Sequence, residues 1–317
     1  MSFILLIIGF FFLIKGADLF VDGAASIARK FNIPSMVIGL TIVAMGTSAP
    51  EAAVSITSSL AGQNDMSVAN VVGSNFFNIL MVLGVSAILA KLPVQKNTIK
   101  KDTPFLLIVS GLLLLFAIDK KISRIEGLIL LIVFVYFLYS TVKNAKNNPE
   151  EESISNDEIA LSEDESSTEV PMLKTIILSI IGLVGIVIGG DMVVDSATSI
   201  ATLFGMSANL VGLTIVAVGT SLPEFVTSIV AIKKGETEIA IGNVIGSNVF
   251  NILLVLGLAT SICPIAISTF ALFDIVFMVA ITILLFIFMK KDNSLVKKHG
   301  FILVAIYIAY MTYTIIR

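Results

Sequence analysis

Two short segments of the sequence place a glutamate close to two hydroxyl residues, a combination that suits the binding of a cation. Residues 46–51 read GTSAPE and residues 219–224 read GTSLPE. In a helix, residues three or four apart lie on the same face, so Thr47, Ser48 and Glu51 are predicted to present their oxygen atoms together. The matching residues of the second segment are Thr220, Ser221 and Glu224.

The proline in each of these segments is predicted to interrupt its helix. Pro50 has no N–H, and its ring clashes with the carbonyl group four residues earlier, at Gly46. Pro223 stands in the same position of the second segment. Carbonyl groups freed by such a break are costly inside a membrane unless they are buried in protein or line a cavity. A bound cation would satisfy them, so we interpret the two breaks as parts of one ion site.

A second pair of segments adds hydroxyl and amide oxygens. Residues 70–80 read NVVGSNFFNIL, and residues 243–253 read NVIGSNVFNIL. Ser74 and Asn78 are four residues apart, so they share a helix face and are predicted to bind a cation directly or through water. The matching residues of the second copy are Ser247 and Asn251. The alternative role, close helix packing and hydrogen bonding between helices, is the one we assign to Gly73, Gly246, Asn75 and Asn248.

The predicted ligands are all oxygen atoms, which favours a hard cation. Calcium takes six to eight oxygens in flexible geometry, whereas magnesium prefers a strict octahedron and gives up its water reluctantly. A charged residue deep in a membrane costs roughly 2.5–3.5 kcal/mol, so Glu51 and Glu224 are expected to be functional. The alternative is a structural glutamate held by a proton or a base, but neither segment contains a basic residue. Two carboxylates balance one calcium or two sodium ions, and a third sodium would make exchange move charge.

Long apolar runs are predicted to carry these segments across a membrane. Hydrophobic residues make up 56% of the 317 residues and charged residues only 14%, whereas soluble domains carry about 25% charged residues. The mean hydropathy is +1.02, and many runs approach the roughly 20 residues that a spanning helix needs. The first run has no basic region before it and is predicted to be a retained helix, not a signal peptide. We therefore predict an all-α membrane protein with ten transmembrane helices, at residues 3–27, 34–60, 67–90, 103–119, 124–143, 172–200, 207–232, 239–262, 269–290 and 299–316.

The distribution of Lys and Arg predicts how these helices are oriented. The connections on one side carry most of the basic residues, whereas the other side has Lys120, Lys121, Arg124 and Arg317. Positive charge stays on the cytoplasmic side of a membrane. We therefore expect a multi-pass protein of the cell (plasma) membrane, with both termini outside and the acidic connection at 144–170 in the cytoplasm.

The chain consists of two related halves. Glu51 and Glu224 are 173 positions apart, and so are Asn78 and Asn251. Five helices in each half is an odd number, so the halves must cross the membrane in opposite directions, a pattern that marks a transporter site near the midplane. The linker lacks the acid spacing and the fixed glycine of an EF-hand loop, so we interpret it as a solvated segment and not as a calcium sensor. The predicted domains are a first five-helix repeat at 1–143, an acidic cytoplasmic linker at 144–170 and a second, inverted five-helix repeat at 171–317.

The remaining composition argues against several other kinds of protein. Cys263 and His299 are the only residues of their types, which excludes an intrachain disulfide, a cysteine metal cage and most histidine-based sites. An intramembrane protease would need a catalytic pair that is not repeated, and a channel would conduct without a counter-ion. We expect a transporter and not an enzyme, with no cofactor, no nucleic-acid partner and no obligatory protein partner. A monomer is compatible with the sequence, which does not give the oligomeric state. We interpret the aspartates of the first and sixth helices as residues that form ion pairs or extend their charged groups to the membrane surface. They are Asp18, Asp22, Asp191 and Asp195.

At these motifs the sequence resembles the sodium/calcium exchanger branch of the calcium/cation antiporter superfamily. The two GTS-x-PE segments and the two GSN-x-x-N segments are similar to the paired alpha repeats of that family, and the resemblance covers essentially the whole chain. It implies an antiporter that exchanges about three sodium ions for one calcium by alternating access. It also implies that the first and sixth helices slide against the other eight.

The resemblance further implies which residues bind each ion. Calcium would be bound by Glu51, Glu224 and the backbone carbonyls of Thr47 and Thr220. One sodium position would use Ala44, Thr47, Ser48, Glu51 and Ser74. The other would use Ala217, Thr220, Ser221, Glu224 and Ser247. A middle position near Asn78 and Asn251 would hold water or a cation.

Differences from two related branches narrow the expected function. Potassium-dependent exchangers resemble this pattern but carry aspartate where this chain has Asn78 and Asn251. Proton/calcium exchangers have a GN-x-x-E segment in place of GTS-x-PE. Exchange without potassium is therefore expected, and H⁺/Ca²⁺ exchange and K⁺-dependent Na⁺/Ca²⁺ exchange stay open as alternatives.

Overall fold

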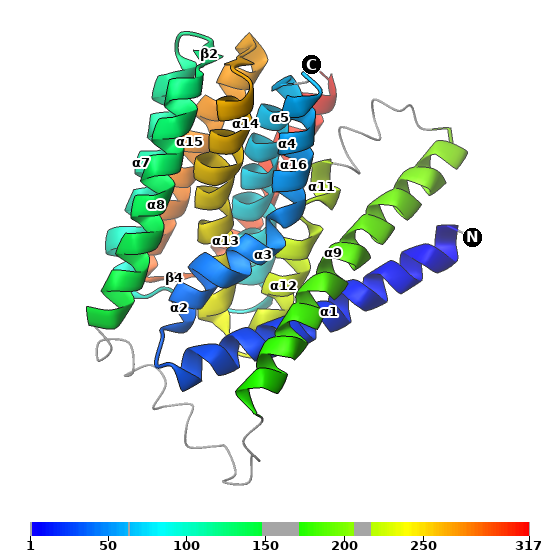
Figure 1. The fold of residues 1–317 in the computed structure, drawn as a ribbon, viewed down its shortest axis with the longest axis vertical. Helices are drawn as coiled ribbons and strands as arrows, with labels where there is room; N and C mark the ends of the chain where they lie inside the picture. Colours follow the sequence, from blue (N-terminus) through cyan, green and yellow to red (C-terminus); the bar gives the residue numbers. More distant parts are fainter. Residues whose placement is uncertain (1, 63, 148–170, 206–216, 317) are drawn as a thin grey trace.

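The chain folds into a bundle of α-helices, seen in a computed structural model that describes residues 2–62, 64–147, 171–205 and 217–316 (Figure 1). The predicted all-α class is confirmed. Among the described residues, six helices are long and apolar enough to cross a membrane, or seven if the bent pair Ser35–Thr47 and Ala49–Leu60 is one span. The number of ten stays a prediction, and most of the predicted linker at 144–170 lies outside the described residues.

Two long helices, α1 (Ser2–Lys30) and α9 (Met172–Leu203), run side by side at an angle to the rest of the bundle (Figure 1). Their contact depends on glycine, because a Cβ atom on Gly16 would lie 2.6 Å from the carbonyl oxygen of Gly182. A Cβ atom on Gly189 would likewise lie 2.6 Å from the backbone nitrogen of Leu13. The two helices therefore touch backbone to backbone.

The second helical segment is interrupted, as its proline predicts. It consists of α2 (Ser35–Ile38), a wide π-helical turn η1 (Gly39–Val43), α3 (Ala44–Thr47) and α4 (Ala49–Leu60). The chain bends by 47° at Ser48, because Pro50 in the first turn of α4 cannot continue the hydrogen bonds of α3. The corresponding segment of the second half has α11 (Ala217–Gly219) and α12 (Leu222–Lys233) on either side of Ser221.

The centre of the bundle is formed by two further composite helices. One joins α5 (Asn64–Phe76), η2 (Phe77–Val82) and α6 (Leu83–Leu89), and the other joins α13 (Thr237–Phe250), η7 (Asn251–Val255) and α14 (Leu256–Ile262). The π-helical turns η2 and η7 lie at the predicted ligands Asn78 and Asn251. Such turns are rare and often mark functional sites.

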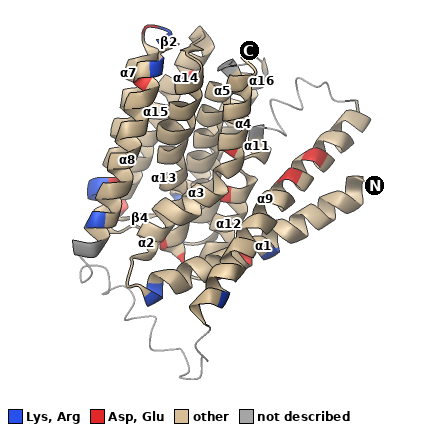
Figure 2. Cartoon of the chain, in the orientation of Figure 1, with Lys and Arg blue, Asp and Glu red and all other residues tan. Residues whose placement is uncertain are grey.

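The outer helices are η3 (Thr98–Asp102) with α7 (Thr103–Ala117), α8 (Arg124–Asn147), α15 (Thr269–Asp292) and α16 (Lys297–Ile316). Large apolar side chains such as Phe11 and Ile125 are exposed on α1 and α8, as expected of a surface that faces lipid. Figure 2 shows Lys and Arg near the ends of the helices, whereas their middle lengths carry few basic residues.

Four two-residue strands join the connections of the two halves. The strand β1 (Leu92–Pro93) pairs antiparallel with β4 (Ser294–Leu295), and β2 (Lys121–Ile122) pairs antiparallel with β3 (Ile265–Ala266). A shift of 173 positions converts β1 into β3 and β2 into β4, so it converts one ladder into the other. The labelled strands β2 and β4 lie at opposite ends of the bundle (Figure 1).

Candidate cation site

The two helix breaks place both predicted carboxylates inside the bundle. Glu51 lies in the first turn of α4 and Glu224 in the first turn of α12. Both side chains are 0% exposed. Within the described residues no ion pair involves either glutamate, so the alternative of a salt-bridged structural glutamate finds no support there. Two buried carboxylates without a basic partner call for a bound cation or a proton.

Each glutamate is held by a serine from the other half of the chain. The Ser48 hydroxyl lies 2.9 Å from Glu224 Oε1, and the Ser221 hydroxyl lies 3.0 Å from Glu51 Oε1. Both serines stand at the break of their own helix, so the two breaks face each other across the centre.

Serines of the central helices complete these contacts from within each half. Ser74 donates to Glu51 Oε1 at 3.3 Å, and Ser247 donates to Glu224 Oε1 at 3.4 Å. Within the described part of the chain, only one oxygen of each carboxylate has a hydrogen-bond partner. The other oxygen of each group faces the interior with no donor.

Four buried acceptor oxygens at the site have no hydrogen-bond partner among the described residues, and they form two pairs related by the repeat. They are Oε2 of Glu51, Oε2 of Glu224, Oδ1 of Asn78 and Oδ1 of Asn251. Buried polar atoms are nearly always satisfied, so four orphaned acceptors in one network call for an electron-poor partner. Carboxylate and amide oxygens are ligands that calcium takes in flexible geometry.

Hydrogen bonds donated by the amide nitrogens of Asn78 and Asn251 fix the orientation of these two side chains, and in the described structure their oxygens remain without a donor. Asn78 Nδ2 donates to Asn248 Oδ1 at 3.1 Å, and Asn251 Nδ2 donates to Asn75 Oδ1 at 3.1 Å. Asn75 and Asn248 also approach each other's backbone carbonyls, at 3.4 and 3.5 Å. The packing and hydrogen-bonding role predicted for Asn75 and Asn248 is thus present, and it also orients the two predicted ligands.

The other predicted ligands lie around this network where the structure describes them. Ala44 and Thr47 are 0% exposed, and Thr220 is half-buried beside the second break. Ala217 begins α11, but the placement of its side chain lies outside the described part of the chain. No group of three or more His, Cys, Asp or Glu side chains that could hold a metal ion occurs in the described ranges. The oxygens that surround the two carboxylates there belong to hydroxyl, amide and carbonyl groups.

Two asparagines that were not predicted as functional residues contact both halves of the site. Asn70 donates to the Glu51 carbonyl at 3.1 Å, and Asn243 donates to the Glu224 carbonyl at 3.3 Å. Their signal in the sequence is spacing, because Asn70 stands four residues before Ser74 and therefore on the same helix face.

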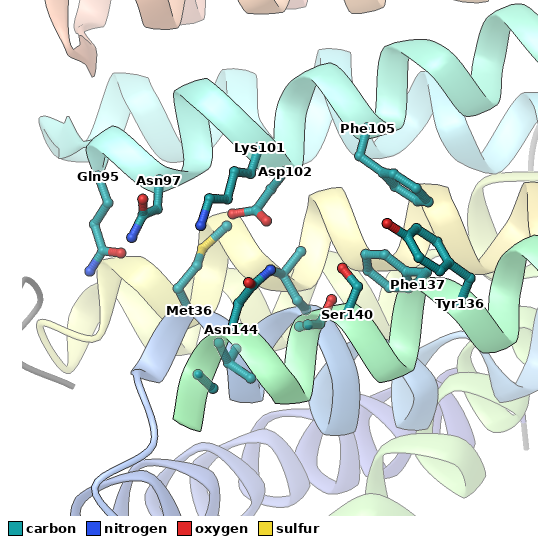
Figure 3. Close-up of a pocket in the computed structure, with 14 residues that line it drawn as sticks. Met36, Gln95, Asn97, Lys101, Asp102, Phe105, Tyr136, Phe137, Ser140 and Asn144 are labelled. Atoms are coloured by element: carbon teal, nitrogen blue, oxygen red, sulfur yellow. The ribbon is translucent and has the colours of Figure 1, made fainter. Parts of the chain in front are cut away.

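A separate cavity of about 190 Å³ opens between the α2–η1 segment, the η3–α7 segment and α8 (Figure 3). Polar residues such as Gln95, Lys101 and Asn144 line it together with the rings of Phe105 and Tyr136. None of the predicted cation ligands lines this cavity. This cavity is therefore separate from the candidate cation site.

Comparisons with known proteins extend over nearly the whole chain. A family profile described as sodium/calcium exchanger protein matches residues 1–143 and 174–316. The sequence is 33% identical to the sodium/calcium exchanger MaX1 of Methanosarcina acetivorans, over 98% of this chain and 97% of that protein. It is 38% identical to the inner membrane protein YrbG of Escherichia coli, over 82% and 79% of the two chains. The structure matches that of the sodium-calcium exchanger NCX_Mj soaked with sodium and strontium, with a TM-score of 0.85, 32% identity, and coverage of 98% of this chain and 97% of that one.

Proposed function

The chain belongs to the sodium/calcium exchanger family, in its prokaryotic type, and on this premise we propose that it exchanges about three Na⁺ for one Ca²⁺. The family consists of membrane ion exchangers, so calcium and its counter-ion are substrates and not cofactors. The proposed exchange moves net charge, needs no potassium and proceeds by alternating access.

One observation carries this proposal, the set of four buried oxygens without donors. Glu51 and Glu224 supply two of them, and Asn78 and Asn251 supply the others. In the proposed site, calcium is bound by the two glutamates and by the backbone carbonyls of Thr47 and Thr220. The two sodium positions beside it use Ala44, Thr47, Ser48, Glu51 and Ser74 in one half and Ala217, Thr220, Ser221, Glu224 and Ser247 in the other.

The charge of the site supports exchange that depends on membrane voltage. The two carboxylates carry a charge of −2 when both are ionised, which one calcium ion neutralises. Three sodium ions in the same site leave a net charge of +1, and moving that charge across a membrane potential costs about 2.3 kcal/mol per 100 mV. The sodium-loaded and calcium-loaded forms therefore respond differently to voltage.

The neutral amides at Asn78 and Asn251 support exchange without potassium. An amide side chain carries no charge, and each amide nitrogen donates a hydrogen bond to an asparagine of the other half. A site with two carboxylates has no further negative charge to balance an additional potassium ion.

We further propose that the chain crosses the cell (plasma) membrane ten times as two inverted five-helix repeats, at 1–143 and 171–317. The termini would lie outside and the acidic linker at 144–170 inside, and no obligatory protein partner is needed. The two strand ladders support the inversion, because β1–β4 and β2–β3 are related by the repeat. The glycine contact of α1 with α9 suits a pair of helices that moves against the remaining ones.

The test is calcium uptake by the purified protein in sealed liposomes. Vesicles loaded with sodium are diluted into sodium-free medium, and the entry of radioactive calcium is followed at several membrane voltages. Parallel vesicles carry only a proton gradient or only a potassium gradient. We expect uptake that needs internal sodium and is lost in Glu51→Gln and Glu224→Gln. Uptake should increase when the vesicle interior is positive, because three Na⁺ leaving for one Ca²⁺ entering carry net positive charge outward.

Two outcomes would contradict the proposed function. Uptake driven equally well by protons would assign a proton-coupled exchanger, and flux without any counter-ion would assign a channel. Uptake that requires potassium together with sodium would contradict the potassium independence alone. A valid comparison requires that each glutamine variant be recovered folded from the membrane in an amount similar to that of the parent.

A further inference from the structure

We propose that Asn243 is a positioning residue of the cation site, which draws the hydroxyl proton of Thr47 away from the carbonyl oxygen of Ala44 and leaves that oxygen free to bind sodium. This inference rests on the proposed function and takes Ala44 and Thr47 as sodium ligands through their backbone carbonyls, so that the Thr47 hydroxyl itself does not bind the ion. Asn70 has the corresponding role in the other half of the chain. Neither asparagine touches an ion in this proposal, and each acts through a threonine.

The orientation of the Asn243 side chain follows from its partners. It is 0% exposed on α13. Its Nδ2 lies 3.3 Å from the carbonyl oxygen of Glu224 and 3.0 Å from the hydroxyl of Ser228. Because a backbone carbonyl only accepts hydrogen bonds, the NH₂ group must face Glu224. The amide oxygen then faces the other way, where the Thr47 hydroxyl lies 3.0 Å from it.

The Thr47 hydroxyl has a single proton, three acceptors within 3.4 Å and the Glu224 carboxylate also nearby. Its oxygen lies 3.1 Å from the carbonyl oxygen of Val43, 3.4 Å from that of Ala44 and 3.0 Å from Asn243 Oδ1. A threonine inside a helix ordinarily donates to a carbonyl three or four residues earlier. Asn243 offers the nearest acceptor and comes from the other half, so it competes with this local bond.

The carbonyl of Ala44 is the acceptor for which this competition matters. It already accepts the backbone N–H of Ser48 at 3.0 Å, so one lone pair is used. A carbonyl oxygen has two lone pairs. The second is available to a cation only while the Thr47 proton points elsewhere. The Val43 carbonyl at 3.1 Å is one alternative acceptor, and Asn243 Oδ1 at 3.0 Å is the nearer one.

The contacts of the asparagine recur in the other half with the two halves exchanged. Asn70 Nδ2 lies 3.1 Å from the Glu51 carbonyl and 2.9 Å from the Ser55 hydroxyl. The Thr220 hydroxyl lies 3.4 Å from Asn70 Oδ1. Each asparagine therefore binds the glutamate backbone of its own half and the threonine of the other. The recurrence is independent support, since the two copies are different residues in different surroundings.

The test compares the half-saturating sodium concentration for calcium uptake in the full chain, reconstituted in sealed liposomes. Asn243→Ala is expected to raise this concentration about three- to tenfold, because the Thr47 proton returns to the helix carbonyls. Adding Thr47→Val removes that proton, so the double variant should need less sodium than Asn243→Ala alone. Adding Thr47→Ser keeps the hydroxyl and should give no such rescue. Asn243→Leu, which keeps the side-chain volume, provides the same comparison if the alanine variant is not recovered folded.

The control is Ser228→Ala, which removes an acceptor of the Asn243 amide but leaves the contact with Thr47, and its sodium dependence should match that of the parent. An Asn243 variant with unchanged sodium dependence would overturn the inference, and so would a Thr47→Val double variant that needs as much sodium as the single variant or more. A purely structural role lowers the maximal rate and the amount of folded protein without producing rescue by a second substitution. Failure of the proposed function would appear differently, as a parent protein whose calcium uptake does not depend on sodium.

Discussion

Ser221 and Glu51 are 170 positions apart in the sequence, yet the Ser221 hydroxyl donates to Glu51 Oε1 at 3.0 Å. Ser48 and Glu224 make the equivalent contact at 2.9 Å. Each buried carboxylate thus accepts a hydrogen bond from a serine that lies at the helix break of the other half of the chain. A movement of either half against the other would change the surroundings of both carboxylates together.

Replacing Ser221 with alanine removes one of these contacts, and we expect it to weaken calcium binding. A hydrogen bond to a charged group contributes about 1.5–3 kcal/mol, which corresponds to a rise of roughly ten- to a hundredfold in the half-saturating calcium concentration. Ser48→Ala should behave alike, because its contact with Glu224 is equivalent. The measurement is calcium uptake at constant internal sodium.

The matched control for these serine variants is Ser110→Ala. Ser110 is also buried, but its hydroxyl donates to the Leu106 carbonyl within α7, away from both glutamates. Its calcium dependence should stay that of the parent. Equal effects of the Ser221 and Ser110 substitutions would mean that the loss of a buried hydroxyl, and not the contact with a carboxylate, is responsible.

Aspartate in place of Asn78 is expected to change the ion requirement. Asn78 Nδ2 donates to Asn248 Oδ1 at 3.1 Å, and a carboxylate there would lose this bond and add a third negative charge. One calcium ion then leaves the site with a net charge of −1, so an additional monovalent cation is favoured. We expect calcium transport by Asn78→Asp to become stimulated by potassium. Uptake measured with and without potassium checks this, with Asn97→Asp as a control outside the network.

The local features of the site could be predicted from the sequence because they depend on short-range chemistry. Pro50 lacks an N–H, so the break between α3 and α4 follows from the covalent structure of one residue. The spacing of Thr47, Ser48 and Glu51 places their oxygens on one face whatever the rest of the chain does. The burial of Glu51 follows similarly from the apolar residues around it.

The contacts between the halves could not be predicted in the same way. No local rule pairs Ser221 with Glu51 or Thr47 with Asn243, because these contacts exist only after two distant helices have packed together. The sequence alone therefore predicts no role for Asn70 or Asn243. The described residues contain fewer clear spans than the ten predicted, for a different reason. The helix α7 has only 15 residues and follows the charged η3 turn, and residues 206–216 lie outside the described part of the chain.

Alanine at Gly16 is expected to separate α1 from α9 and to slow exchange. Its Cβ atom would lie 2.6 Å from the Gly182 carbonyl and 2.7 Å from the Ile186 nitrogen, both in the backbone of α9. Forcing extra volume into a packed contact costs about 1–3 kcal/mol. The measurements are the thermal unfolding temperature in detergent and the rate of sodium-driven calcium uptake, both of which should fall.

Gly185→Ala is the control for this substitution, because a Cβ atom there would come no closer than 3.4 Å to Gly16. That distance is an ordinary contact, so its unfolding temperature should stay close to that of the parent. A Gly16→Ala variant as stable and as active as Gly185→Ala would show that the backbone contact of the two helices is not needed.

Removing the charge of Lys234 is expected to loosen α1 from the core at one end of the bundle. Lys234 Nζ lies 2.7 Å from Asp22 Oδ1 and 3.7 Å from Asp18 Oδ1, which ties the end of α12 to α1. The repeat places Ala61 at the position equivalent to Lys234, so the equivalent end of α4 has no such base. Partly exposed ion pairs contribute about 0.2–1 kcal/mol, so Lys234→Gln should speed amide hydrogen exchange in residues 18–30 by about 1.4- to fivefold. Lys15→Gln removes a base that, among the described residues, pairs only within α1, at 3.4 Å from Asp18, and should leave that exchange unchanged.

High salt should reproduce part of the Lys234 effect in the parent protein, because it screens exposed charges. Protection of α1 that is insensitive both to Lys234→Gln and to salt would assign its docking to the apolar and glycine contacts alone.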